Sequence, residues 1–190
     1  MASVVVGLVV GAVSALVLLG NGQLLGRQQH AGGWFGNANA GSTAADPYTR
    51  AIIARIGLMA LNRSETIYFH NYTDDRGDRL SQDCVYELSG GDLPARWWGV
   101  TIYAGDDFLP VNGDDAQSVD KTRMVRDADG RWTARVAATR ADASNWISSK
   151  NAGTFSLGIR MYNPDPGARD DPATIPFPVL KRLSCAGDQA

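Results

Sequence analysis

The sequence predicts a mainly β protein: an antiparallel, jelly-roll-like β-sandwich with one amphipathic helix, preceded by a single N-terminal transmembrane helix. Three observations predict this architecture. Short segments with alternating apolar residues recur between turns rich in Gly, Asp and Pro, as in antiparallel sheets. One segment near position 50 has helical periodicity instead. Residues 1–26 carry no charged side chain. We therefore divide the chain into an anchor at 1–26, a flexible tether at 27–45 and a β domain at 46–190.

The anchor is the first element. From Val4 to Leu19 almost every residue is aliphatic, and a spanning helix needs about 20 largely apolar residues. A cleaved signal peptide is the alternative, but the basic segment that usually opens one is missing. Gly7, Gly11 and Ala15 place small residues on one face, where another membrane helix can approach closely. We expect an uncleaved span that contacts the lipid bilayer and, through this face, a membrane-protein partner.

Two observations give opposite predictions for the side of the membrane on which the domain lies. Arg27 follows the span, and the positive-inside rule would keep the domain in the cytoplasm. Cys84 and Cys185 argue for the opposite side. Each lies in or at the end of a strand-like segment, and in an oxidising compartment they can form a disulfide. Two buried free thiols are the alternative. We follow the cysteines and expect an exported domain.

The tether at 27–45 is rich in Gly, Ala, Asn and Ser. This composition is typical of a flexible linker rather than a packed element. Trp34 and Phe35 interrupt the tether as two exposed aromatic residues. They are expected either to lie at the membrane interface or to dock on the domain.

A helix is predicted to begin at Asp46-Pro47. The Asp46 carboxylate can cap the first turn, and proline is favoured at the first helical position. Apolar residues from Tyr48 to Met59 recur at helical spacing, so the helix is expected to extend to about Leu61. Its apolar face predicts packing against the domain.

From Thr66 onwards the apolar period changes to two, which predicts short strands. We expect strands at 66–72, 82–88, 97–103, 122–125, 131–137, 155–162 and 179–183. In the third of these, Trp98 and Ile102 would face the core while Trp97 and Tyr103 face the other side. The fourth and fifth flank an Asp-Ala-Asp-Gly turn and are expected to pair as a hairpin.

Three motifs carry a family resemblance. They are Leu-Pro-Ala-Arg-Trp-Trp with Thr-Ile-Tyr at 93–103, Asn-Trp-Ile-Ser-Ser with Gly-Thr-Phe at 145–155, and Arg-Met-Tyr-Asn-Pro at 160–164. In this order and spacing the chain resembles the DUF1214 family, and in particular its short, membrane-anchored bacterial members. The resemblance covers roughly 46–185 and implies a β-rich, jelly-roll-like domain. From the anchor and the cysteines we expect this domain at the bacterial inner membrane, facing the periplasm. The resemblance supplies no catalytic residues, and larger relatives carry a DUF1254 domain ahead of this domain.

Composition excludes two classes of function. The 18 basic and 20 acidic residues give a net charge of −2 and form no basic stripe, so no nucleic-acid partner is expected. Two cysteines and two histidines allow no common ligand cluster, so no metal or cofactor is expected. The four carboxylates at positions 106, 107, 114 and 115 suggest calcium ligands, but their spacing favours a solvated acidic loop.

One cluster of residues is the candidate ligand site. If strands 97–103 and 155–162 pair, five side chains meet on one face: Arg96, Trp97, Tyr103, Arg160 and Tyr162. A cation beside aromatic rings suits a sugar, a carboxylate or a lipid headgroup. The alternative is a structural cluster that braces the sheet.

The sequence favours a non-enzymatic role, as a binding or accessory subunit of a membrane complex. It contains no nucleophile elbow, phosphate-binding loop or dinucleotide fingerprint. His70 has no identifiable nucleophile or orienting acid, so a structural role is expected for it. The alternative is a membrane-surface hydrolase or carbohydrate-active domain that uses the arginine, tryptophan and tyrosine cluster.

Overall fold

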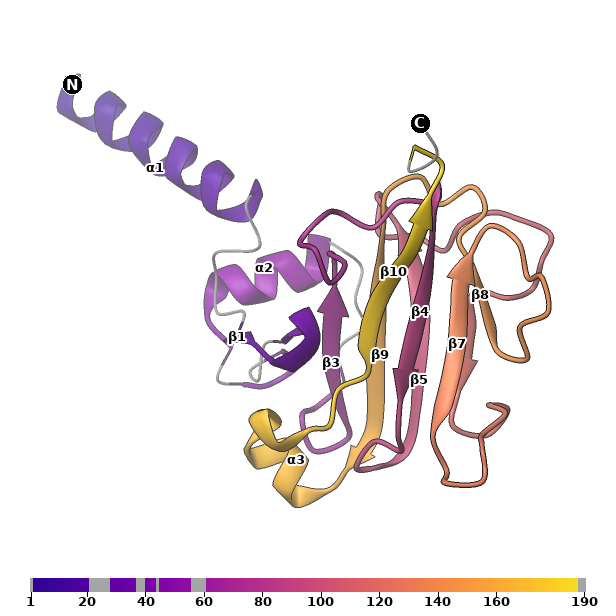
Figure 1. Ribbon diagram of the computed structural model, residues 1–190. Helices are drawn as coiled ribbons and strands as arrows, with labels where there is room; N and C mark the ends of the chain where they lie inside the picture. Colours follow the sequence, from indigo (N-terminus) through magenta and orange to yellow (C-terminus); the bar gives the residue numbers. More distant parts are fainter. Residues whose placement is uncertain (1, 21–27, 37–39, 44, 56–60, 188–190) are drawn as a thin grey trace.

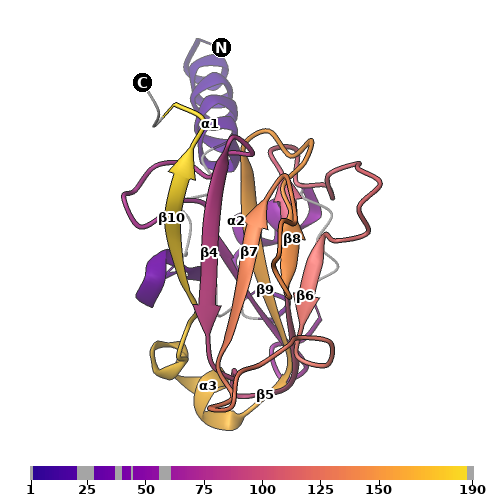
Figure 2. The same ribbon diagram turned by 45° about the vertical axis from the view of Figure 1, so that its right-hand side comes forward.

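Two β-sheets packed face to face form the body of the protein (Figure 1). The computed structural model describes residues 2–20, 28–36, 40–43, 45–55 and 61–187. Figure 2 shows the four-stranded sheet in front, with strands of the six-stranded sheet behind it. The predicted β-sandwich is thus confirmed at the level of its two layers.

The six-stranded sheet contains, in order, β1 (Gln28–Gln29), β2 (Phe35–Gly36), β3 (Thr66–Asn71), β9 (Phe155–Pro164), β5 (Ala95–Ala104) and β6 (Ser118–Asp120). The four-stranded sheet contains β10 (Val179–Cys185), β4 (Cys84–Gly90), β7 (Trp132–Ala137) and β8 (Trp146–Ser148). Neighbours pair antiparallel except β7 and β8, which are parallel. The sequence did not predict β8 as a strand, because three residues are too few to show a period.

Alternation along β5 and β9 builds the core between the sheets. On β5, Trp98, Val100 and Ile102 are fully buried, and β9 buries Leu157 and Ile159 to the same extent. Each such side chain contributes about 1.5–3 kcal/mol relative to exposure. The predicted inward face of the strand at 97–103 is confirmed.

Helices lie outside the two sheets, beginning with α1 (Ala2–Gly20) and α2 (Pro47–Arg55) (Figure 1). None of the helices in the described part of the chain combines the length and the apolar character that a membrane crossing requires. The predicted span at 1–26 also includes residues 21–26, which lie outside the described residues.

The start of α2 agrees with the predicted cap. Asp46 Oδ1 accepts hydrogen bonds from the backbone N–H groups of Tyr48 and Thr49, at 2.9 and 3.1 Å. The predicted extension to about Leu61 stays a prediction: Leu61 itself is not helical, but the five residues before it are not described. Residues 56–60, including two of the predicted apolar positions, lie outside the described residues.

Residues 28–36 are structured, so the predicted flexible tether is wrong for this part of the chain. β2 pairs with β3, and a 3₁₀ turn, η1 (Ala31–Gly33), precedes it. Trp34 was expected to be exposed but is fully buried, and its Nε1 donates to the carbonyl oxygen of Pro178 at 2.8 Å. Of the two predicted placements for this aromatic residue, docking on the domain is confirmed.

The predicted hairpin of 122–125 with 131–137 is wrong in its first strand. The turn forms, since the Asp127 N–H donates to the Arg131 carbonyl oxygen at 2.8 Å. The segment before the turn connects β6 of the six-stranded sheet to β7 of the four-stranded sheet. Residues 122–125 therefore pair with no strand in the described structure. Instead, the Asn145 side chain bonds both the N–H and the carbonyl oxygen of Val125, each at 2.8 Å.

The last part of the chain closes the sandwich through α3 (Pro166–Asp170), the 3₁₀ turn η2 (Pro172–Thr174) and β10. Cys84 and Cys185 lie opposite each other on β4 and β10 and form a disulfide. The predicted bridge is confirmed over the alternative of free thiols. Cross-linking residues 101 positions apart stabilises the fold by about 4.7 kcal/mol in the chain-entropy model.

Candidate functional site

The register of β5 with β9 assembles a group of polar and aromatic residues on the outer face of the six-stranded sheet. Trp97 lies opposite Tyr162, and Gly99 lies opposite Arg160. These side chains face away from the four-stranded sheet, since the residues between them point into the core. On the other side of β9, His70 of β3 is opposite Gly158.

We call His70, Trp97, Tyr103, Arg160 and Tyr162 the outer-face patch. The Arg160 guanidinium carbon lies 5.7 Å from the centre of the Tyr103 ring. The Trp97 and Tyr162 rings meet edge to face at 5.4 Å, and the His70 and Tyr103 rings are 6.0 Å apart. The structure therefore brings together four of the five residues that the sequence singled out, and adds His70.

Two glycines under the patch allow the rings to lie close to the sheet. A Cβ atom at Gly158 would lie 2.9 Å from the Tyr103 ring and 3.2 Å from the His70 ring. At Gly99 it would lie 3.1 Å from the Trp97 indole. Any larger residue at Gly158 would push the Tyr103 ring aside, so the flat floor of the patch depends on these positions.

Arg160 is half-buried, and within the described part of the chain no carboxylate lies within ion-pair distance of it. Burial raises the pKa of the Tyr103 hydroxyl above its usual range, and the nearby Arg160 charge opposes that rise. Tyr103 is therefore a neutral hydroxyl near neutral pH, and Arg160 supplies the positive charge of the patch.

The acid nearest to Arg160 in the sheet register is engaged elsewhere. Asp120 of β6 lies opposite Gly99, but one of its carboxylate oxygens accepts from Arg123 Nε at 2.6 Å. The other oxygen accepts from the backbone N–H groups of Thr122 and Arg123. With both oxygens occupied, Asp120 is poorly placed to serve as a general acid or base for a ligand on the patch.

Arg96 does not join the outer-face patch. By strand alternation it lies on the same side of β5 as Trp98, away from the face that carries Trp97, and it is exposed. The cation over the Trp98 ring is Arg126 instead, at 5.7 Å. The sequence-based grouping of Arg96 with the other four residues is therefore corrected.

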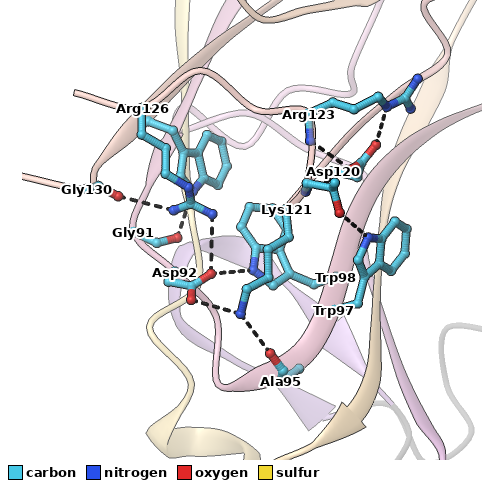
Figure 3. Close-up of polar contacts among 12 residues, drawn as sticks. Gly91, Asp92, Ala95, Trp97, Trp98, Asp120, Lys121, Arg123, Arg126 and Gly130 are labelled. Atoms are coloured by element: carbon cyan, nitrogen blue, oxygen red, sulfur yellow. Dashed lines mark hydrogen bonds and ion pairs between the residues drawn. The ribbon is translucent and has the colours of Figure 1, made fainter. Parts of the chain in front are cut away.

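A second cation–aromatic cluster, which the sequence did not reveal, surrounds Asp92 (Figure 3). Asp92 Oδ1 accepts from Trp98 Nε1 at 2.8 Å and from Arg126 at 3.3 Å, while Oδ2 pairs with Lys121 Nζ at 2.9 Å. Lys121 also donates to the Ala95 carbonyl oxygen at 3.0 Å. We call Asp92, Trp98, Lys121 and Arg126 the Asp92 cluster.

In the Asp92 cluster, one carboxylate is shared by two cations, Lys121 and Arg126. Partial burial of the Asp92 carboxyl opposes its ionisation, but hydrogen bonds from Trp98 and Lys121 and the charges of Lys121 and Arg126 outweigh this. The pKa of Asp92 is therefore lowered. Asp92 and Lys121 also line a groove of about 540 Å³ beside α3 and η2. Because Lys121 is already bonded, the groove offers a ligand less than the patch does.

The other predicted sites are placed as follows. In the acidic loop, Asp106 caps the Phe108 N–H and Asp114 accepts from Ser148 at 2.6 Å, and within the described residues no three potential ligands gather for a metal ion. On α1, nothing lies within 4 Å of a Cβ atom added at Gly7 or Gly11. That face is open at these two glycines for the predicted helix contact, whereas Ala15 is partly buried.

The fold and the patch define a two-sheet β-sandwich domain with a cation–aromatic surface on one sheet. The family model described as "Protein of unknown function (DUF1214)" matches residues 65–166. The chain therefore belongs to the DUF1214 family. Among curated proteins, none matches the chain.

Two solved structures are similar to the chain. The crystal structure of the VPA0106 protein from Vibrio parahaemolyticus has a TM-score of 0.64 at 22% identity, and the match covers 94% of this chain and 44% of that one. An uncharacterized protein from Burkholderia cenocepacia has a TM-score of 0.49 at 19% identity, over 63% of this chain and 30% of that one. The chain thus spans less than half the length of the Vibrio protein, which shares its fold.

Proposed function

We propose that the protein is a membrane-anchored envelope protein of the bacterial inner membrane. Its sandwich lies in the periplasm and acts as a non-enzymatic binding or accessory subunit. The observation that carries the binding role is Arg160, a half-buried cation held over an aromatic ring with no carboxylate paired to it within the described structure. A cation in that state is suited to receive a ligand or partner group.

The composition of the first 26 residues supports the anchor. They carry no charged side chain, and Val4, Leu8 and Leu16 of α1 are each more than half exposed. Apolar surface of this kind gains free energy on transfer from water to lipid. The described part of α1 falls short of a span, so the proposed anchor includes residues 21–26.

The disulfide between Cys84 and Cys185 supports export. Such bonds persist in oxidising compartments and are rare in reducing ones. The predicted small-residue face of Gly7, Gly11 and Ala15 is open at its two glycines, which supports a helix contact with a membrane-protein partner.

Fractionation of bacterial cells that express the full chain tests the anchor and its orientation. We expect the protein to stay in membranes washed with alkaline carbonate, and we expect protease added to spheroplasts to digest the sandwich. A chain lacking residues 1–26 is the control and should leave the membrane fraction. Carbonate extraction of the full chain, or protection of its sandwich in intact spheroplasts, would overturn the proposal.

A further inference from the structure

The outer-face patch carries one positive charge without a counter-charge. The Arg160 guanidinium is charged at all physiological pH values. It packs over Tyr103, and no described residue forms an ion pair with it. The residues opposite it on the neighbouring strands are Tyr68 and Gly99, neither of which is acidic. A single guanidinium in this setting matches a single negative charge, and its planar fork fits a carboxylate.

The aromatic part of the patch is accessible next to that charge. Trp97 is 37% exposed, and its indole lies over Gly99. The Trp97 Nε1 donates to Thr122 Oγ1 at 3.1 Å, which fixes the ring, and Tyr162 packs against its edge at 5.4 Å. A ring held in place presents a flat apolar surface at little conformational cost.

Hydroxyl groups complete the face. Thr101 and Tyr103 are two residues apart on β5 and therefore lie on the same face of the strand, so both hydroxyls belong to the face that carries Arg160. A ligand rich in hydroxyls gains more from such a face than a purely apolar acid does.

From these three properties we infer that the outer-face patch binds a monoanionic, hydroxylated ring, an acidic sugar of the uronic acid type. The Arg160 guanidinium holds its carboxylate, the Trp97 and Tyr162 rings contact its apolar face, and the hydroxyls of Thr101 and Tyr103 bond its hydroxyls. This inference rests on the proposed binding role and names the ligand class of the same site. The sugar belongs either to a free monosaccharide or to the end of a surface polysaccharide, and the carboxylate-bearing ring is common to both.

Titration of the full chain with D-glucuronate tests the inference, with the protein in a polyoxyethylene detergent that carries no sugar. The readout is the chemical shift of the Trp97 indole N–H, assigned with Trp97→Phe. D-Glucose, which has the same ring without the carboxylate, is the matched ligand. We expect glucuronate to bind about tenfold or more tightly than glucose, as for a charge-assisted hydrogen bond. A glucuronate-capped oligosaccharide should shift the same resonance if the sugar is a polysaccharide end.

The chain offers a matched arginine as a control. Arg160→Gln should remove the preference for glucuronate, whereas Arg96→Gln, which removes the same charge from the other side of β5, should keep it within about twofold. Arg160→Lys should give an intermediate affinity, because it keeps the charge but not the fork. The circular dichroism and melting temperature of each variant establish that it is folded.

Four results would overturn the inference: equal binding of glucuronate and glucose, an equal loss in Arg96→Gln, binding of benzoate as tight as glucuronate, or tighter binding of inorganic phosphate. The first two reject the patch as a carboxylate site. The last two reject the sugar class. None of them bears on membrane location, which the cell fractionation decides separately.

Discussion

Two arginines of this protein lie at the same distance from an aromatic ring, yet their surroundings differ. Arg126 lies 5.7 Å from the Trp98 ring and Arg160 lies 5.7 Å from the Tyr103 ring. Arg126 also pairs with Asp92 and donates to the Gly130 carbonyl oxygen. For Arg160, no ion pair is formed within the described residues. The same cation–aromatic geometry thus occurs once with its charge neutralised and once without.

The difference comes from which residues face each arginine. Asp92 lies in the turn before β5, where it reaches the indole of Trp98 and two cations at once (Figure 3). Arg160 lies in the middle of a sheet, between Tyr68 and Gly99. An arginine that is paired with a carboxylate contributes to stability, whereas an unpaired cation keeps its affinity for an external anion. The comparison assigns a structural role to the Asp92 cluster and a binding role to the outer-face patch.

Removing the central acid should have the largest effect on stability. Asp92→Ala leaves the buried Trp98 N–H without its acceptor and two cations without their partner, so we expect a loss of about 2 kcal/mol in the free energy of unfolding. Arg160→Gln should cost less than about 1 kcal/mol, since only a cation–π contact is lost. Urea unfolding followed by circular dichroism measures both changes.

Asp142→Ala serves as the control for charge in that experiment. Asp142 is exposed, and its removal should change the free energy of unfolding by no more than about 0.5 kcal/mol. If Asp92→Ala were as mild as Asp142→Ala, or if Arg160→Gln were the more damaging variant, the assignment of roles would be reversed.

A smaller effect is expected in acid. The pKa of Asp92 is lower in the folded protein than its ordinary value of 3.8. Its ionised form therefore stabilises the fold above that value, and this contribution is lost as the pH falls through the folded pKa. Asp92→Asn should flatten the fall in stability between about pH 5 and pH 2. Asp142→Asn is the control for the loss of one exposed carboxylate; a slope in Asp92→Asn that equals that of the unchanged protein would contradict the lowered pKa.

The smallest effect concerns the Tyr103 hydroxyl. Burial raises its pKa, and Arg160 partly offsets the rise, so Arg160→Gln should raise the pKa further. NMR titration of tyrosine labelled with ¹³C at the ring carbon that bears the oxygen measures this, with Tyr103→Phe for assignment and Arg96→Gln as the control. A Tyr103 titration curve identical in Arg160→Gln and the unchanged protein would mean that the two side chains do not meet in solution.

Much of the sandwich could be predicted because strand alternation is a local property. The inward residues of the strands at 97–103 and 155–162 are those that the structure buries, and the two strands do pair. The patch followed from that pairing. Arg96 was placed wrongly because it is adjacent to Trp97 in the sequence, whereas adjacent residues of a strand face opposite sides.

Other features depend on contacts between distant segments. Trp34 lies in a stretch with the composition of a linker, and its burial depends on Pro178, which is 144 positions away. Val125 has the residue types of a strand, but its backbone is bonded by the side chain of Asn145. Neither partner could be identified from the pattern around the residue itself.

The sequence by itself determined the uncharged N-terminal stretch, the alternating strands, the family motifs and the two cysteines that can bridge. Each of these features depends only on residue types or on the apolar pattern of a short segment, and both can be read without knowing which distant residues meet. Only the tertiary structure decided which arginine is neutralised. Asp92 and Arg126 are 34 positions apart, and whether a charge meets a partner depends on how the loops and sheets bring distant side chains within a few ångströms.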